Sequence, residues 1–427
     1  MTSVLLGAIP FDGHTTPMLG VARRFTELGI RVRFLAGSAY ADRVRAAGAE
    51  FLPLPAECDR VADAIVREEA DARLHGAAAL RENLNEVFIR PTAAQYRALL
   101  DAIAAEPTDA VLTETGFSGA SVLLRTPGRP PVIVCGILPL GVTSRDTAPF
   151  GLGLPPDASP LGRVRNRALS WFMEHVLFRP NQKLADSTMR ELTGHDMGGY
   201  FLDWPARADA IAQFTVPSFE YPRSDAPANL RFYGPVSRLA PSSIPLPAWW
   251  RDLDGRRPVV HVTQGTVANT DFGELVRPTL EGLADEDVLV VVSTGGRPVS
   301  ELGALPANAR AAEMLPYADL MPRTDVLVTN GGYGGLHYAF ESGVPVVVAG
   351  DTEDKPETAA RVAWAGAGVN LRTGTPTASA VRGAVRAVLA DGRYAEASAR
   401  IGGDIRVSPG VDGLAEFVRS LAPLSAK

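Results

Sequence analysis

The sequence predicts an α/β protein with two similar halves, each built around a parallel sheet covered by helices. The first observation is that short apolar runs and amphipathic segments alternate from the start of the chain, at residues 3–9, 17–28, 31–36, 41–47 and 50–53. The second is a similar series that begins at Val259 and continues to about residue 408. Strands that alternate with helices form parallel sheets, because each crossover helix returns the chain to the same edge.

Composition narrows the class of protein. The chain has 427 residues, enough for two domains, with 46% hydrophobic and 21% charged residues. Its net charge of −6 and the absence of a polybasic stretch argue against a nucleic-acid partner. No run of 18 apolar residues is present, so we expect no membrane partner, and residues 1–9 lack the features of a leader sequence. A cytoplasmic enzyme is therefore expected.

The cysteines bear on disulfide and metal sites, and a proline-rich segment marks a domain boundary. Cys58 and Cys135 are not in a C-x-x-C pair, so neither a disulfide framework nor a zinc site is expected. Residues 221–257 hold several prolines and little periodicity, which is typical of a linker. The predicted organisation is a first domain at 1–220, a linker at 221–257, a second domain at 258–410 and a closing helix at 411–427.

Within the first half, several further elements are predicted. Residues 60–106 have the pattern of two long helices, and strands are expected at 109–113, 131–136, 208–215 and 231–233. Residues 137–163 are a loop rich in proline and glycine, and long loops of this kind are typically functional or mobile. A helix is expected from Val164 to about Leu184, kinked or ended by Pro180.

The stretch from Val326 to Arg361 carries the strongest chemical signal. An apolar strand at 326–329 ends in Asn330-Gly331-Gly332-Tyr333-Gly334-Gly335, a helix follows at 336–341, and a second strand is expected at 344–349. Glycines allow a ligand to lie directly on the backbone, and a helix N-terminus favours negative charge. This pattern predicts a phosphate or pyrophosphate site. Asp351, Glu353 and Asp354 follow the second strand and suit a sugar's hydroxyl groups.

A histidine is the main candidate for acid–base chemistry. His14 follows the first strand and precedes the first helix, where Pro17 suits the first turn. A side chain at such a place projects into a cleft, and a histidine titrates near neutral pH. The competing interpretation is a loop histidine that caps the helix.

Four motifs together resemble a known family. They are Gly13-His14-Thr15-Thr16-Pro17, Thr263-Gln264-Gly265-Thr266, Leu315-Pro316-Tyr317, and N-G-G-x-G…G-V-P…E-D-x-x-x-x-A-x-R-V from Asn330 to Val362. The chain resembles the GT-B glycosyltransferases of the UDP-glycosyltransferase superfamily, within them the actinobacterial and macrolide-type enzymes that glycosylate natural products. The resemblance implies two Rossmann-like domains with parallel sheets, facing each other across a cleft. The nucleotide-sugar would bind the C-terminal domain and the acceptor the N-terminal one.

The resemblance also implies roles for individual residues. His14 would be the general base, and Glu114 stands where the family has the Asp that orients it. A solvated Glu at the end of a strand is the competing interpretation. The implied donor-binding residues are Thr263, Gln264, Gly265, Thr266, Met314, Leu315, Asn330, Gly331, Gly332, Gly334, Gly335, Glu353, Asp354 and Lys355. The implied acceptor-binding residues are Phe11, Asp12, Phe88, Phe150 and Leu152, for which an incidental apolar surface is the alternative.

Four residues depart from the family's usual donor contacts. Asn330 stands where a His contacts the diphosphate, and Gly335 where a Ser or Thr adds a hydroxyl. Tyr338 stands where many relatives have a Glu for the ribose, and Lys355 replaces a Gln. Backbone N–H groups from Gly331 to Gly335 need no side chain, so the diphosphate site is expected to remain.

The expected function is inverting, metal-independent transfer of a hexose from UDP-glucose or a dTDP-sugar to a hydroxyl of a hydrophobic natural product. Macrolides, ansamycins of the rifamycin type and polyphenols all fit as acceptors, in biosynthesis or in antibiotic resistance. We expect no cofactor beyond the nucleotide-sugar co-substrate, no metal, and a monomer or weak homodimer.

Three alternatives remain at this point. A nucleotide-sugar 2-epimerase on the same fold would not need the apolar loop at 137–160. A hydrolase is suggested by Gly116-Phe117-Ser118-Gly119-Ala120, although Ala120 breaks the G-x-S-x-G pattern. An inactive sugar-nucleotide binder is compatible with the four altered donor positions.

Overall fold

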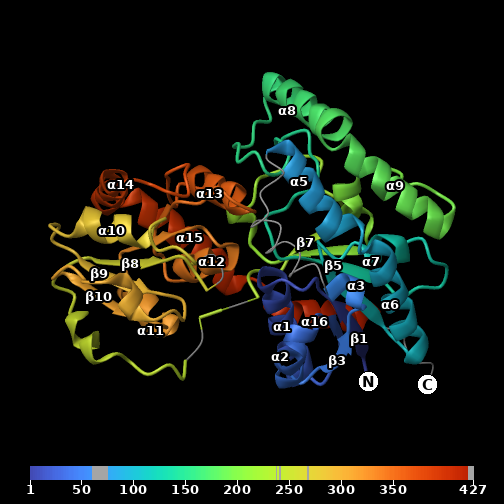
Figure 1. Cartoon of the computed structure of the whole chain (residues 1–427), viewed down its shortest axis with the longest axis horizontal. Helices are drawn as coiled ribbons and strands as arrows, with labels where there is room; N and C mark the ends of the chain where they lie inside the picture. The colour runs from blue at the N-terminus through green and yellow to red at the C-terminus, as the bar shows by residue number, and fades with distance from the viewer. Residues whose placement is uncertain (60–75, 237, 240–241, 267–268, 422–427) are drawn as a thin grey trace.

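The chain folds into two α/β halves, each with a parallel sheet (Figure 1). The structure is a computed structural model and describes residues 1–427 except 60–75, 237, 240–241, 267–268 and 422–427. Residues 60–75 of the segment predicted as two long helices at 60–106 therefore lie outside the described residues, and the described part contains the helices Ala77–Leu84 and Thr92–Ala105. Both cysteines are buried and free. Among the described residues, no helix combines the length and the apolar character needed to cross a membrane.

The first sheet has seven parallel strands in the order β3-β2-β1-β4-β5-β6-β7. These strands are β1 Ser3–Gly7, β2 Arg31–Ala36, β3 Glu50–Pro53, β4 Ala110–Glu114, β5 Val132–Gly136, β6 Ala210–Gln213 and β7 Leu230–Phe232. Around them lie α1 Asp12–Glu27, α2 Ala41–Ala46, α3 Ala56–Asp59, α5 Ala77–Leu84, α6 Thr92–Ala105, α7 Gly119–Leu123, α8 Pro160–Phe172 and α9 Arg179–Thr193. The residues of β1, β4 and β5 are fully buried, as apolar runs inside a parallel sheet should be.

The second sheet has six parallel strands in the order β10-β9-β8-β11-β12-β13. These are β8 Val259–Thr263, β9 Leu289–Ser293, β10 Ala309–Ala312, β11 Val326–Thr329, β12 Val346–Val348 and β13 Gly368–Asn370. The helices of this half are α10 Val276–Leu283, α11 Tyr317–Leu320, α12 Tyr333–Glu341, α13 Lys355–Trp364, α14 Ala378–Ala390 and α15 Arg393–Val407. The predicted fold class of two parallel sheets is confirmed.

The last helix returns to the first half. Helix α16, Gly410–Leu421, packs against α1, and its Val411, Leu414 and Val418 belong to the core under the first sheet (Figure 1). The backbone N–H of Gly410 donates to the carbonyl of Tyr233 at 2.7 Å. The point where the chain re-enters the N-terminal half therefore lies beside the point where it leaves that half. The predicted closing helix is thus part of the N-terminal half.

Several sequence-based boundaries are wrong. Strand β7 pairs with β6, so the first sheet extends beyond residue 220 into the segment assigned to the linker. Helix α1 begins at Asp12, with Pro17 inside it rather than in its first turn. Pro180 lies in the first turn of α9, where its missing N–H costs nothing, so it starts a helix rather than ending one.

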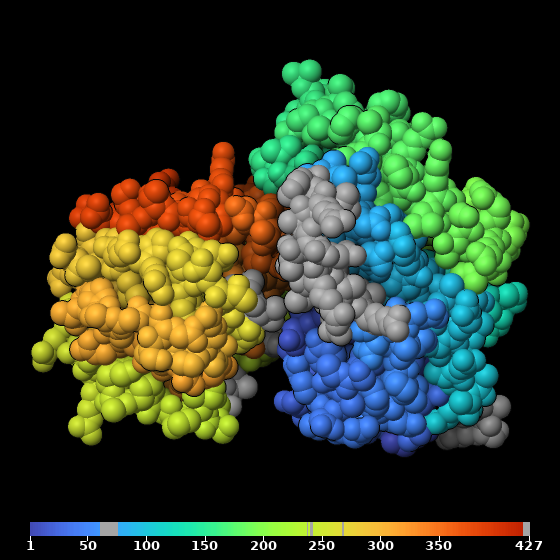
Figure 2. All heavy atoms as spheres, in the orientation of Figure 1, coloured from blue at the N-terminus to red at the C-terminus, as the bar shows by residue number. Residues whose placement is uncertain are grey.

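The two halves meet through side chains of the segment after β6. Phe219, in the short turn Pro217–Phe219, contacts the rings of Tyr333 and Phe340 of α12. Thr215 Oγ1 and His337 Nε2 are 2.8 Å apart, and burial lowers the pKa of His337 to about 4, so this contact is made by a neutral imidazole. The space-filling view shows the two halves as two bodies that lie side by side (Figure 2).

Candidate active site

His14 and Glu114 form a hydrogen-bonded pair at the carboxyl edge of the first sheet. Strands β1 and β4 are neighbours, His14 lies in the first turn of α1 after β1, and Glu114 is the last residue of β4. His14 Nδ1 lies 2.7 Å from Glu114 Oε2. The predicted pairing is therefore present, with Glu114 fully buried and the His14 side chain 16% exposed. Sequence alone placed His14 in a loop; it lies on the helix instead.

The Glu114 carboxylate is fixed by the backbone. Its Oε1 accepts from the N–H of Ile9 at 3.2 Å, and its Oε2 accepts from the N–H of Gly116 at 2.6 Å. These two donors compensate for the water that a buried carboxylate loses. The extra methylene of Glu relative to Asp therefore still allows a short contact with the imidazole.

Electrostatics favour a basic His14. Burial by itself lowers the pKa of the imidazole, but the charge and the hydrogen bond of Glu114 raise it, and the charges of Asp354 and Glu353 add to this effect. The pKa of His14 is consequently above its usual 6.5. Because Asp354 and Glu353 belong to the C-terminal half, the His14–Glu114 pair and the acidic loop interact electrostatically across the boundary between the halves.

The glycine-rich loop after β11 opens toward solvent. Gly331 has a φ of 91°, which favours glycine, and an added Cβ would lie 2.7 Å from Val348. A Cβ added at Gly332, Gly334 or Gly335 would meet no atom within 4 Å. Helix α12 begins at Tyr333, three residues before the predicted start, and no side chain caps it. Its first N–H groups are thus available to an anion.

A second loop lies beside the first. Strand β8 pairs with β11, so Thr263, Gln264, Gly265 and the exposed Thr266 follow a neighbouring strand end. The Asn330 amide, expected to contact the diphosphate, donates from Nδ2 to the carbonyl of Gln264 at 2.7 Å. The side chain of Gln264 is buried and bonded to the backbone of Asp271 and Val276. In this structure Asn330 thus ties the two loops together, and Gln264 holds the second loop through its side chain.

The acidic loop after β12 is compact. Glu353 has a φ of 56°, unusual for a residue other than glycine. Lys355, expected to offer donors to the sugar, is buried, and its Nζ contacts Glu353 Oε2 at 2.6 Å and Thr352 Oγ1 at 3.1 Å. Burial, followed by the charge of Glu353, raises the pKa of Asp354 to about 6. Asp354 is therefore a carboxyl group that titrates close to neutral pH.

The residues expected to contact the base lie at the end of β10. Leu315 is buried with Leu253, Val259 and Leu289, whereas Met314 is 44% exposed. Tyr338, one of the four departures, packs edge-on against Tyr317 with ring centroids 5.8 Å apart. A Tyr at this position therefore fills space beside the Leu315 cluster.

The expected acceptor residues divide into two sets. A Cβ added at Gly116 would lie 2.8 Å from Phe88 and 3.1 Å from Glu114 Oε2, and the Phe11 ring is 6.2 Å from that of His14. Phe11 and Phe88 thus lie beside the His14–Glu114 pair. Asp12 was also expected to contact the acceptor. In the structure its carboxylate forms an ion pair with Arg43 of α2 at 2.6 Å.

The remaining acceptor residues lie in the loop that follows β5. Phe150 is partly buried against Gly141, and Leu152 is 39% exposed. The loop is bonded along its length, for example from Thr143 N to Asp203 and from Ser144 Oγ to Asp225. These contacts give it a defined path over the N-terminal half.

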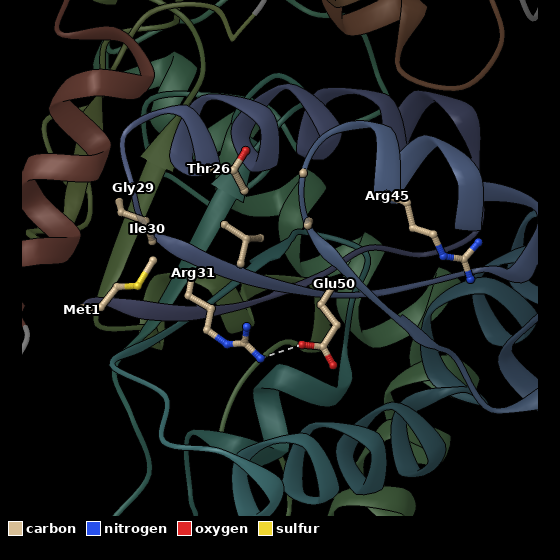
Figure 3. A pocket seen from close by; sticks show the side chains of 10 residues that line it. Met1, Thr26, Gly29, Ile30, Arg31, Arg45 and Glu50 are labelled. Atoms are coloured by element: carbon tan, nitrogen blue, oxygen red, sulfur yellow. Dashed lines mark hydrogen bonds and ion pairs between the residues drawn. The ribbon is translucent and has the colours of Figure 1, made fainter.

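Two other candidate sites do not have the features of a catalytic centre. Ser118, the serine of the hydrolase-like motif, is buried and hydrogen-bonded to Thr92 and Gln95. Figure 3 shows a surface hollow beside Met1, Arg31 and Glu50, where Arg31 and Glu50 form an ion pair at 2.9 Å. Arg31 and Glu50 begin β2 and β3, so this hollow lies at the edge of the sheet opposite to Glu114.

Sequence reasoning assigned no role to two buried charges in α13. Glu357 and Arg361 are less than 5% exposed and face the N-terminal half. Their spacing of four residues on an alanine-rich helix was the available signal, because a charge on an apolar helix face is buried only when it is paired.

The fold and the paired loops define a class of protein with two Rossmann-like domains and a histidine–carboxylate pair at the carboxyl edge of the first sheet. Residues 277–421 match the family model described as "Erythromycin biosynthesis protein CIII-like, C-terminal domain". The chain is 42% identical over 403 residues to 4'-demethylrebeccamycin synthase of Lentzea aerocolonigenes, covering 93% of this chain and 94% of that one. It is 37% identical to UDP-glycosyltransferase 2 of Phaeomoniella chlamydospora, with 98% and 95% covered.

Solved structures agree on the fold. The calicheamicin glycosyltransferase CalG4 superposes with a TM-score of 0.75 over 100% of both chains at 22% identity. The spinosyn rhamnosyltransferase SpnG complexed with thymidine diphosphate gives a TM-score of 0.68 over 99% of this chain and 100% of that one, at 20% identity. The chain belongs to the GT-B glycosyltransferases of the UDP-glycosyltransferase superfamily, and it is a glycosyltransferase.

Proposed function

We propose that this enzyme transfers a hexose from UDP-glucose, with inversion and without a metal ion, to a hydroxyl group of a hydrophobic natural product. The observation that carries the proposal is the His14–Glu114 pair, whose closest atoms are 2.7 Å apart. The charge of Asp354 in the opposite half contributes to the raised pKa of His14. A general base and an acidic sugar loop that act on each other electrostatically fit a reaction in which the acceptor attacks a bound sugar.

The pairing of His14 sets the direction of proton transfer. If Nδ1–H donates to Glu114, then Nε2 carries the lone pair that accepts the hydroxyl proton of the acceptor. The acceptor oxygen then forms a bond to the anomeric carbon as the bond to the diphosphate breaks on the opposite face. The buried Glu114 carboxylate stabilises the imidazolium that results.

The leaving diphosphate gains negative charge as the bond breaks. The uncapped start of α12 and the open backbone at Gly332, Gly334 and Gly335 offer N–H groups for that charge. Glu353 and Asp354 are the groups for the sugar hydroxyls, with Lys355 neutralising part of the local charge. A protonated Asp354 donates a hydrogen bond, whereas an ionised one only accepts.

Relatives support the donor and acceptor classes. UDP-glucosyltransferase 1 of Beauveria bassiana is 36% identical over 91% of this chain, which favours UDP-glucose over a dTDP-sugar. 4'-Demethylrebeccamycin synthase and the spinosyn rhamnosyltransferase are named for natural products, and Phe11 and Phe88 provide apolar surface beside His14 for such an acceptor. We therefore place macrolides, ansamycins and polyphenols first in a screen.

The test is a mass-spectrometric screen of UDP- and dTDP-sugars against a mixed acceptor library, with wild type, His14→Ala and the control His175→Ala. His175 is exposed on the surface next to Trp171. Loss of a general base lowers the rate by about 10²–10⁴-fold. We expect that loss for His14→Ala with UDP binding retained, and no loss for His175→Ala. Equal transfer by His14→Ala and wild type would contradict the mechanism, and no product with any acceptor would contradict the function.

A further inference from the structure

Three charged side chains are buried together between the two halves. Arg361 of α13 donates from Nε and Nη2 to Glu220 Oε1 at 2.9 and 2.6 Å, and from Nη1 to Glu357 Oε2 at 2.8 Å. All three side chains are at most 6% exposed. Glu220 belongs to the N-terminal half and Glu357 to the C-terminal half. A buried ion network is weak evidence for stability, because desolvation opposes the attraction between the charges.

The remaining carboxylate oxygens of this network hold the loop that follows β5. Glu220 Oε2 accepts from the N–H of Leu140 at 2.8 Å, close to where the loop begins. Glu357 Oε1 accepts from the N–H groups of Gly151 and Gly153, both at 2.9 Å. One network thus fixes the loop near its start and again at residues 151–153, and the second contact comes from the opposite half.

The tip of the loop lies directly on the first turn of α13. Gly153 has a φ of 58°, and an added Cβ would lie 2.9 Å from the carbonyl oxygen of Pro356. Pro356 follows Glu353, Asp354 and Lys355 without a gap. The loop that carries Phe150 and Leu152 therefore contacts the same turn of chain that begins with the sugar-binding residues.

Two members of the network, Glu220 and Arg361, have pKa values shifted toward the charged form. Burial by itself raises the pKa of Glu220. The positive charges of Arg361 and Arg223 lower it by more than burial raises it, so the pKa lies below the usual range. The Arg361 guanidinium also stacks over the Tyr221 ring, 4.1 Å from its centroid. The hydrogen bond from Arg361 to Glu357 Oε2 fixes the orientation of this carboxylate, so that its Oε1 is held toward the N–H groups of Gly151 and Gly153.

We propose that Glu357, held in place by Arg361, is a positioning residue for the acceptor. It fixes the loop of residues 140–153 to helix α13, next to the residues proposed to bind the sugar. Phe150 and Leu152, the loop side chains expected to contact the acceptor, are thereby held in a fixed position relative to the bound sugar. The proposal rests on the proposed function. Glu357 touches neither substrate, and it acts through the backbone of Gly151 and Gly153.

Two variants test this role by independent routes. Glu357→Gln keeps the size of the side chain but removes the charge that serves both Arg361 and the two N–H groups. Gly153→Ala leaves the ion network intact but places a Cβ against the Pro356 carbonyl, which displaces the loop tip. The control is Glu286→Gln, which breaks an ion pair with Arg386 at the surface of the same half.

The readouts are the acceptor KM, the donor KM, the UDP dissociation constant by calorimetry, and hydrolysis of the sugar donor without acceptor. Loss of a charge-assisted hydrogen bond corresponds to roughly a tenfold to hundredfold change in affinity. We expect the acceptor KM to rise about tenfold or more in both variants, while UDP binding and donor hydrolysis stay at the wild-type level. The control should leave every value unchanged.

Two results would overturn the proposal. One is an unchanged acceptor KM in both variants; the other is a parallel loss of UDP binding, which would show a general structural role. If Glu357→Gln fails to fold, Gly153→Ala alone decides between these outcomes. A wild-type protein that transfers sugar to no acceptor would contradict the proposed function, whereas an active wild type with insensitive variants contradicts only the positioning role.

Discussion

Glu114 Oε2 receives two hydrogen bonds from different sources, one from His14 Nδ1 at 2.7 Å and one from the backbone of Gly116 at 2.6 Å. The backbone contact holds the carboxylate whether or not the imidazole is charged. The orientation of His14 is thus set by the end of β4 and does not depend on substrate.

Replacing Glu114 tests the His14–Glu114 pair through the pH dependence of activity. The pKa of His14 is raised, and only the neutral imidazole acts as a base, so activity should rise with pH through that raised pKa. Glu114→Gln removes the attraction, so the midpoint of the acid limb of kcat/KM should move to lower pH. The maximal rate should fall by about 10²-fold or more because the imidazolium loses its partner. Glu114→Asp should retain more activity.

The control for this experiment is Glu106→Gln, which removes a partner of Arg31 at the opposite edge of the sheet. Its pH profile should match the wild type. An acid limb that stays in place in Glu114→Gln would mean that another group controls the profile.

The acidic loop should limit stability at neutral pH. The folded-state pKa of Asp354, about 6, exceeds the ordinary 3.8, so the folded state holds the proton more tightly and stability falls as pH rises from about 4 through 6. A shift of about two pKa units corresponds to on the order of 2–3 kcal/mol. Asp354→Asn should therefore be more stable than wild type at pH 7.5 but not at pH 4, while binding donor more weakly. Urea unfolding at both pH values measures this, with the exposed Asp319→Asn as control; equal gains at both would contradict it.

Gly335 offers a gain of function. Its surroundings are open, and the family usually has a hydroxyl side chain at the corresponding position. Gly335→Ser should tighten UDP binding roughly threefold to tenfold, the range of one added hydrogen bond. It should also stabilise α12 slightly, because serine favours a helix more than glycine does.

Gly383→Ser on α14 is the matched control for that change. Gly383 also has no atom within 4 Å of an added Cβ, so it should gain the helix preference without any change in UDP affinity. Tighter binding in both variants, or in neither, would show that the hydroxyl at position 335 does not reach the nucleotide.

Helix α16 should matter for the stability of the N-terminal half alone. Leu414 is fully buried in the core with α1, and Leu→Ala at such a site costs about 2–5 kcal/mol. Leu414→Ala should lower the free energy of unfolding by that amount, with UDP affinity unchanged because the donor loops are in the other half. Val407, 83% exposed, is the control for substitution to Ala. A loss of UDP affinity in Leu414→Ala would contradict this separation.

Local patterns predicted most of the fold. The strand at 326–329 has the predicted bounds because a short apolar run before glycines has few other structures available. The start of α1 was misplaced because Pro17 suggested a first turn, whereas Asp12 already begins the helix. A strand was expected at 231–233, close to β7, but its residues were also assigned to the linker, because the surrounding prolines and polar residues do not reveal its pairing with β6.

The parts of the candidate site that belong to a sequence motif were predictable. His14, Glu114 and the glycine loop lie where strand order brings them, and parallel strands place their carboxyl ends at one edge. The contact from Asn330 to Gln264 and the burial of Lys355 depend on side chains that meet only after folding. The same holds for Glu220 and Arg361, which are 141 positions apart in sequence.

The return of α16 to the first half has a consequence for engineering by recombination. Since the chain leaves the N-terminal half near Tyr233 and re-enters it at Gly410, the C-terminal half is in effect a domain inserted between two pieces of its neighbour. A chimera that exchanges sugar specificity with a relative should therefore be spliced at both points, keeping residues 410–421 from the parent of the N-terminal half. A single splice in the linker would pair α1 with a foreign helix and mismatch the core of the N-terminal half.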